Sequence, residues 1–454
     1  MTKPDTLFAG AAQIDITPNI GAVIGVDMFP TYVEAIHDPL HAKVLIFKNQ
    51  SLTLAIYVID ICIMDTPFMD LIKQKISENT GVQAANILLC CNHNHASGDV
   101  VGLLGGKVDQ SYKNSLPSLL LELTQNALQK LQPAKIGFGS VLAPEFVVCR
   151  RYVMDGAYEA HNPVSGGLDK VKTNPINAEG KIIKRVAEPD PEVCFIAVKS
   201  LEGEWISILA NYGLHYAADW PAGVITADFF GTFSKHIKTH IIASDDFTAM
   251  MSNGTSGDVN IWDFLEPDRL PTAHFEKSEL IGKTIAERVF IALETLEWQE
   301  NTELAVLNQE IQLEVRKPTT AEVEVARKNI AEVNFDEIAL LPNAIQHIYD
   351  REQILLMNYP DVSIQQLQVV KIGNIVLGAL PGEFFAETGL ALKKDNPQYH
   401  YFSVNLANTY GGYIPPKQEF DLGGYETWRA RSSCMETNSE EKVRTSINKM
   451  IKAV

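Results

Sequence analysis

The sequence predicts an α/β protein in which mixed β-sheets pack with helices. Two observations predict this fold class. Segments of strand-like and helix-like hydrophobic pattern alternate along most of the 454 residues, and no internal repeat or low-complexity run interrupts them. No clear linker divides the chain either, so we expect residues 1–454 to form a single domain.

In the first third of the chain, a hairpin precedes a helix and a buried strand. Residues 42–49 and 52–60 flank a short turn and are expected to pair. An amphipathic helix follows and ends at Gly81, because glycine commonly stops a helix. The further expected elements are a short buried strand over 85–91, a helix over 111–132, and strands over 135–140 and 145–149.

The rest of the chain alternates in the same way. Residues 152–190 are rich in Gly, Pro, Asn and Asp, which predicts a long loop. The apolar runs 192–200 and 204–215 then predict a strand pair with a Glu-Gly turn between them. The remaining expected elements are helices over 274–298, over 319–333 and from Glu440 onward, and two strands over 366–383 around a Gly-Asn turn.

Composition excludes several classes of function. The chain has 38 basic and 56 acidic residues, a net charge of −18, and no Lys/Arg cluster supplies the basic face that nucleic-acid binding requires. Anionic membrane surfaces should repel such a chain, and no uninterrupted apolar run approaches the roughly 18 residues of a membrane span. Residues 1–21 show no secretion signal, so we expect a cytoplasmic protein.

The cysteines do not form a recognisable metal or redox motif. No Cys-x-x-Cys spacing occurs, which leaves neither a cysteine-rich zinc site nor a thioredoxin-like motif. Several cysteines lie inside apolar runs, where cysteine behaves as a small buried hydrophobe. The six are Cys62, Cys90, Cys91, Cys149, Cys194 and Cys434.

The most prominent local motif is His93-Asn94-His95, directly after the expected strand 85–91. Imidazoles two residues apart in extended chain point to the same side, and the carboxyl end of a strand is where α/β proteins place ligands. The pattern therefore indicates a metal or oxyanion site. Taken alone, so short a pattern more often reflects two loop histidines with hydrogen-bonded rings.

Two further candidates also follow apolar strands. His215 ends the run 204–215, and Glu383 follows the run 375–380, between a glycine and two phenylalanines. The alternatives are a hydrogen-bonded histidine with no metal, and a carboxylate that caps the next helix. Two histidines and a glutamate are ligands that zinc favours, and a catalytic zinc keeps an open position for a water whose pKa falls to about 7.

Two other patches are less informative. The Gly-rich turn 252–260 has no following lysine, so it is not a phosphate-binding P-loop, and it does not match the nucleophile elbow. The tyrosines Tyr410, Tyr413 and Tyr425 lie near the end of the chain. Most such tyrosines are packing residues with a solvated hydroxyl.

Taken in order over residues 8–430, these motifs resemble the neutral (alkaline, non-lysosomal) ceramidase family. The family's T-H-T-H-S-G-P segment corresponds to NHNHASG, its N-x-x-x-H-P to NYGLHY, its G-[DN]-[LV]-S-P-N turn to GDVNIW, and its P-G-E-[FP] to LPGEFF. The family's N-x-Y-x-x-Y and a later tyrosine match Tyr410, Tyr413 and Tyr425, and IHDPLHAKVLIF resembles its G-[IL]-H-x-R region.

The resemblance implies a site and an activity. It implies a zinc ion held by His93, His215, Glu383 and Tyr413. The positions that match substrate or oxyanion contacts are His95, Arg150 (with Arg151 as the alternative) and Tyr425. The implied activity is hydrolysis of an amide that joins an acyl chain to an amino alcohol.

The chain departs from the family pattern at informative positions. Asn260 stands where the family has a serine, and an amide cannot act as a hydroxyl nucleophile or proton relay. We expect Asn260 to hold the substrate by hydrogen bonds instead. Asp99 replaces the proline after the H-x-H segment, and no C-terminal immunoglobulin-like domain is expected, because the chain ends soon after the tyrosines.

We therefore expect a zinc-dependent hydrolase in which a metal-activated water attacks an amide of a small-molecule or lipid-like acyl substrate, without nucleic acid or stable membrane insertion. Two alternatives stay open. A zinc-dependent esterase or lactonase acting on a small polar metabolite would suit the acidic composition and the missing signal. A non-catalytic metal-binding or carbohydrate-binding relative would suit the loss of serine at position 260.

Overall fold

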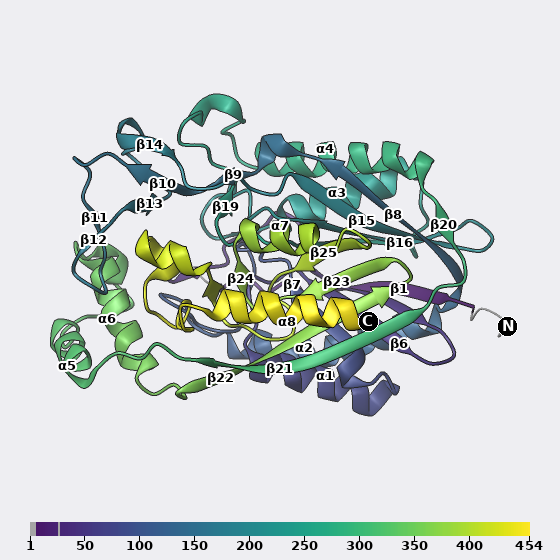
Figure 1. Ribbon diagram of the computed structural model, residues 1–454, viewed down its shortest axis with the longest axis horizontal. Coiled ribbons are helices and arrows are strands. Elements are labelled where there is room, and N and C mark those ends of the chain that lie inside the picture. Colours follow the sequence, from purple (N-terminus) through teal and green to yellow (C-terminus); the bar gives the residue numbers. More distant parts are fainter. Residues whose placement is uncertain (1–5, 26–27) are drawn as a thin grey trace.

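The structure, a computed structural model, describes residues 6–25 and 28–454. Two β-sheets lie face to face, and helices cover their outer sides (Figure 1). The predicted α/β class with mixed sheets is therefore confirmed.

The larger sheet has nine strands and mixes both pairing directions. Most neighbours are antiparallel, whereas the β6–β7 and β16–β18 pairs are parallel. Its order is β18 (Thr248–Asn253), β16 (Trp205–Tyr212), β15 (Glu192–Ser200), β8 (Gln132–Leu142), β1 (Phe8–Asp15), β5 (His41–Lys48), β6 (Thr53–Ile59) and β7 (Ile87–Cys91), with β20 (Trp298–Gln299) paired to β8.

The smaller sheet supplies the opposite wall of the central core. Its order is β21 (Leu304–Glu314), β22 (Val362–Ile372), β23 (Ile375–Ala379) and β25 (His400–Val404). Because side chains alternate along a strand, one face of each sheet contributes apolar residues to a shared cluster. Ile56 and Leu88 of the larger sheet belong to this cluster together with Val370 and Leu377 of the smaller.

Helices cover three outer regions. The pair α1 and α2 packs on the β5–β7 end of the larger sheet, α3 and α4 pack on its β15–β18 end, and α7 and α8 pack on the smaller sheet. The bounds are α1 Thr66–Thr80, α2 Gln110–Gln129, α3 Asp228–His240, α4 Glu276–Ala292, α5 Thr320–Asn329, α6 Ala344–Leu356, α7 Ala386–Asp395 and α8 Ser439–Ala453.

Helix α1 has the residues at both ends that favour the start and the end of a helix, which explains why it was predictable from the sequence. The Asp65 carboxylate accepts a hydrogen bond from the Phe68 N–H and so caps the first turn. Gly81 ends the helix at φ 76°, a left-handed conformation that glycine adopts without a steric penalty. The predicted hairpin over 42–60 and the strand pair over 192–215 are also present, as β5–β6 and β15–β16.

The prediction of a long loop over 152–190 is wrong in part. The segment forms a small three-stranded sheet of β10 (Arg151–Met154), β13 (Val171–Thr173) and β14 (Ile182–Arg185), and a two-stranded pair of β11 (Ala160–His161) and β12 (Leu168–Asp169). Strands of two to four residues are too short to show an alternating pattern.

All six cysteines are buried and none is in a disulfide, which confirms the expected burial. Among the described residues, no helix combines the length and the apolar character needed to cross a membrane.

Stability should fall as the pH rises towards 8, because of a buried carboxyl group at the start of α3. Burial, together with the nearby Asp219, raises the pKa of Asp228 to about 8. Between its ordinary value and about 8, the folded chain therefore holds a proton that the unfolded chain has lost. Raising the pH in that range favours unfolding, by at most about 1.4 kcal/mol per pH unit, and the slope levels off above pH 8.

Urea unfolding of wild-type protein and of Asp228→Asn at pH 6, 7, 8 and 9 measures this dependence. The variant should lose less stability than the wild type between pH 6 and pH 8. A hydrogen bond lost in the variant lowers its free energy of unfolding by the same amount at every pH. The difference between the two pH dependences therefore still measures the proton bound by Asp228. Equal slopes would show that Asp228 does not titrate in this range.

Candidate metal centre

Three strand ends deliver the candidate metal ligands to one place. His93 lies two residues beyond β7, and His215 lies three residues beyond β16. Glu383 begins β24 (Glu383–Phe384), shortly after β23 of the smaller sheet. The three side chains are buried, and their ligand atoms all lie within 4.8 Å of one another.

The loop after β7 is fixed by asparagine side chains. Asn92 donates to the Asp60 carboxylate and accepts from the Asn94 N–H, while the Asn94 amide donates to the Thr226 carbonyl. His93 itself has φ 70°, a left-handed conformation that is unfavourable for a residue with a side chain. Such strain persists only where the surroundings impose it, and it is frequent at functional sites.

The loop after β16 is joined to the loop after β7. The amide of Asn253, the last residue of β18, donates to the carbonyls of Asn92 and Leu214. One side chain therefore fixes the spacing of the two histidine loops. This arrangement follows from the parallel pairing of β16 with β18, which brings Asn253 opposite Tyr212.

Glu383 is placed by a short parallel pair rather than by a helix. It lies in register with Tyr413, the first residue of β26 (Tyr413–Ile414). Helix α7 begins only at Ala386, so Glu383 is not a helix cap. Gly257 lies so close that an added Cβ would come within 2.6 Å of the Glu383 carbonyl oxygen, and only glycine allows this approach.

The distances suit a tetrahedral metal site. The Nε2 atoms of His93 and His215 are 3.1 Å apart, and Glu383 Oε2 lies 3.3 Å from the first and 3.8 Å from the second. Ligand atoms of a tetrahedral zinc site are about 3.3 Å apart, because each lies roughly 2.0–2.1 Å from the ion.

The hydrogen bonds on the far side of each ring fix which nitrogen is free. His93 Nδ1 is 3.1 Å from the Cys62 carbonyl oxygen, and His215 Nδ1 is 2.9 Å from the Ser256 carbonyl oxygen. A carbonyl oxygen only accepts, so each Nδ1 carries the proton and each Nε2 keeps its lone pair. Ligand histidines in metal proteins are oriented in this way.

The Glu383 carboxylate supports the same assignment. Its Oε2 is buried and has no hydrogen-bond partner among the described residues, while Oε1 accepts from the Tyr410 hydroxyl. An ionised oxygen beside two imidazole lone pairs lacks a positive partner, and a divalent cation fits that deficit.

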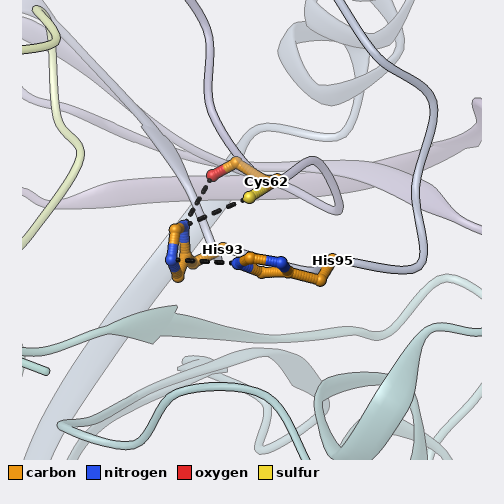
Figure 2. A group of neighbouring side chains, drawn as sticks. All are labelled: Cys62, His93 and His95. Carbon is orange, nitrogen blue, oxygen red and sulfur yellow. Dashed lines mark hydrogen bonds between the residues drawn. The ribbon is translucent and has the colours of Figure 1, made fainter. Parts of the chain in front are cut away.

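His95 extends the cluster towards solvent. Its Nε2 is 3.3 Å from His93 Nε2, and Figure 2 shows His93 in contact with both His95 and Cys62. The Cys62 thiol faces His93 Nδ1 at 3.4 Å, so these three residues form a second group with metal-ligand atoms. Burial and the neighbouring His93 lower the pKa of His95 well below its usual range, which keeps the ring neutral.

The two adjacent arginines point to different partners. Arg150 Nη1 is 3.2 Å from His215 Nε2, and its Nη2 donates to the Tyr413 hydroxyl at 3.2 Å. Arg151 instead donates to the carboxylates of Glu419 and Glu426. Of the two alternatives, the structure therefore brings Arg150 to the candidate centre.

Two predicted tyrosines lie beside Arg150. The Tyr413 and Tyr425 rings meet edge to face with centroids 5.7 Å apart, and the Arg150 guanidinium lies over both, 5.5 and 5.1 Å from their centroids. Tyr413 pairs with Glu383, which is the position expected of a fourth ligand. Tyr425 lies behind the Tyr413 ring, further from Glu383.

Asn260 is placed at the edge of this cluster. It ends β19 (Val259–Asn260), which pairs with β9 (Val148–Cys149), directly before Arg150. Its amide nitrogen donates to Asn174 Oδ1, and its oxygen accepts from the Ile261 N–H. Its hydrogen bonds within the described chain therefore do not reach the histidines.

Sequence reasoning missed two residues of the site. Glu426 is fully buried and accepts from Arg150 Nε at 3.0 Å and from Arg151 Nη1 at 2.8 Å. Tyr216, the residue after His215, packs its ring 4.0 Å from the His95 ring. Its position directly after a candidate ligand was an available signal, whereas Glu426 resembles any loop glutamate in the sequence.

Comparisons with known proteins agree with this architecture. One solved structure, described as a ceramidase complexed with C2, matches with a TM-score of 0.72 at 13% identity, and a neutral ceramidase from Pseudomonas aeruginosa matches with 0.70 at 15%. Each match covers 99% of this chain and 75% of the other chain.

In sequence, 77 residues are 39% identical to neutral ceramidase A of Dictyostelium discoideum, a match that covers 15% of this chain and 10% of that relative. No family model matches. The expected resemblance is confirmed at the level of architecture: this chain has the fold of the neutral ceramidases.

Proposed function

We propose that the protein is a zinc-dependent hydrolase that cleaves an amide between an acyl chain and an amino alcohol, the activity expected of a ceramidase-like enzyme. The observation that carries the proposal is the convergence of His93 Nε2, His215 Nε2 and the unpartnered Glu383 Oε2. The similarity of fold to neutral ceramidases supports the same chemistry.

His93, His215 and Glu383 would hold the ion, with the Tyr413 hydroxyl as the fourth protein ligand. These are nitrogen and oxygen ligands of the kind zinc prefers. When bound, zinc acts as a Lewis acid that makes water acidic enough to attack an acyl carbon near neutral pH.

The chain's own residues would stabilise the charge that develops on the acyl oxygen. Arg150 is fully buried and presents its guanidinium beside His215 and Tyr413. A donor that is already in place costs no reorganisation during the reaction, and removing one such donor lowers the rate by about 10²–10³. His95, a neutral ring in the same cluster, would contact the substrate, and Tyr425 would form the adjoining wall.

Asn260 favours a second candidate, an ester or lactone substrate. An amide nitrogen must receive a proton before it leaves, whereas an alkoxide leaves more easily. The Asn260 amide cannot relay that proton, and Asn174 and Ile261 already occupy part of its hydrogen-bonding capacity. We propose that Asn260 orients the substrate by hydrogen bonding rather than taking part in bond cleavage.

Elemental analysis and a paired hydrolysis assay test the proposal. Purified protein should contain about one zinc ion per chain, and a chelator should remove both the metal and the activity, which added zinc restores. N-acyl amino alcohols and the matching acyl esters are then compared with wild-type protein and Asn260→Ser.

If only esters are hydrolysed, the proposal of an amide substrate is wrong and the proposal of an ester substrate takes its place. Bound zinc without turnover of either substrate class would favour the non-catalytic relative. Full activity in metal-free protein would refute zinc dependence.

A further inference from the structure

A separate cavity lies away from the candidate metal centre. It has a volume of about 870 Å³, within the roughly 300–1,000 Å³ range of small-molecule sites. Strands β1 and β5 supply one wall, α3 supplies another, and the chain that leads into α4 supplies a third. None of the candidate metal ligands lines it.

The cavity contains a buried lysine. Lys43 is 3% exposed and lies in register with Gln13 of β1, which also lines the cavity. Its ammonium donates to Ser234 Oγ at 3.1 Å, and no carboxylate of the described residues lies within ion-pair distance of it. A buried ammonium without a counter-charge is unfavourable, so an anionic ligand at this position would stabilise it.

The rest of the lining also favours an anion. Besides Lys43, three lysines line the cavity, against three carboxylates, in a chain whose net charge is −18. Some of these groups already have partners: Asp38 accepts from the Ala227 N–H and Glu279 contacts His236, while Lys238 and Lys283 pair with Asp245 and Glu287 outside the cavity. Of the four lysines, Lys43 and Lys235 form no ion pair among the described residues. The other lysines are Lys235, Lys238 and Lys283, and the carboxylates are Asp38, Glu276 and Glu279.

Apolar groups complete the lining and indicate more than an inorganic anion. Phe275 stacks on His37 with centroids 3.8 Å apart, and the remaining apolar wall comes from prolines, a leucine and a second phenylalanine. A bare phosphate would leave this surface in contact with water. An organic anion would cover it while its charged group reached Lys43. The other apolar side chains of the lining are those of Pro39, Ala227, Phe247, Ala249, Pro271 and Leu280.

We propose that this cavity is a second ligand site, which binds a small amphiphilic carboxylate whose charged group pairs with Lys43 and whose apolar part lies against the Phe275 wall. The site does not rest on the proposed hydrolysis, because none of the candidate metal ligands lines it, although Thr226, whose carbonyl accepts from Asn94, borders both.

Isothermal titration calorimetry with octanoate tests the proposal, with 1-octanol and inorganic phosphate as probes of the apolar and the charged part alone. Wild-type protein should bind one octanoate per chain, at least tenfold more tightly than either partial probe. Lys43→Met should weaken octanoate binding at least tenfold. Lys135→Met, a control on β8 outside the cavity, should leave it unchanged.

Leu280→Glu provides a second test that does not disturb the sheet. Leu280 is 37% exposed, so the variant should fold, and its carboxylate would repel an anion in the cavity. Octanoate binding should weaken at least tenfold. Unchanged octanoate affinity in both Lys43→Met and Leu280→Glu would place any binding elsewhere, the metal centre included, and would overturn the proposal. If phosphate binds as tightly as octanoate, the apolar wall contributes nothing and the proposal of an amphiphilic ligand is wrong.

Discussion

Replacing Glu383 by glutamine is expected to abolish hydrolysis and to empty the metal site. The substitution keeps the size of the side chain but removes the negative charge beside His93 and His215. A metal ligand contributes more than a single oxyanion donor, so activity should fall by more than the roughly 10²–10³ lost with one such donor. Zinc content and hydrolysis rate, measured on the same preparation, check both effects.

The chain offers a matched control for this experiment. Glu387 lies four residues later, is exposed, and occupies the first turn of α7, the role that the sequence left open for Glu383. Glu387→Gln should keep both zinc and activity. Tyr410→Phe removes only the hydrogen bond to Oε1 and should lower metal affinity or activity by about 10–100-fold. Wild-type zinc content in Glu383→Gln would contradict the ligand assignment.

The candidate site was predictable where its residues follow strong local signals. His93, His215 and Glu383 each follow an apolar run, and the ends of strands are where side chains from distant segments meet. The choice between Arg150 and Arg151 was not predictable, because successive residues in extended chain point to opposite sides. Only the placement of the strands decides which side faces the histidines.

Helix α3 and the burial of Glu426 were not predicted from the sequence, because both depend on contacts between distant segments. Helix α3 buries Phe229, Phe230, Phe233 and Ile237 at helical spacing, yet its glycine and its aromatic and β-branched residues have low helix propensity. Packing against α4 and β18 overrides that preference. Glu426 lies 276 positions after Arg150 in the sequence, and its burial follows from the tertiary fold alone.

The second large effect is expected at Glu426, which we assign as a positioning residue for Arg150. Its carboxylate receives hydrogen bonds from Arg150, Arg151 and the Thr173 hydroxyl, and all four side chains are buried. Burial disfavours a charged arginine, yet Glu426 and Glu419 raise the pKa of Arg151 above its ordinary value. Glu426→Gln would leave two guanidinium groups short of negative charge and should destabilise the fold by about 3–5 kcal/mol.

Glu419→Gln separates the structural effect from the positioning effect. Glu419 accepts a hydrogen bond from Arg151 but none from Arg150 among the described contacts, so its loss should lower the free energy of unfolding and leave kcat unchanged. Glu426→Gln should lower both, because Arg150 would no longer be held beside His215 and Tyr413. Urea unfolding gives the free energy of unfolding of each variant. The KM and kcat of each variant are measured without urea, at a temperature at which both variants are folded. An equal kcat in the two variants would mean that Glu426 acts on stability alone and that Arg150 keeps its place through the Gly257 carbonyl and Tyr413.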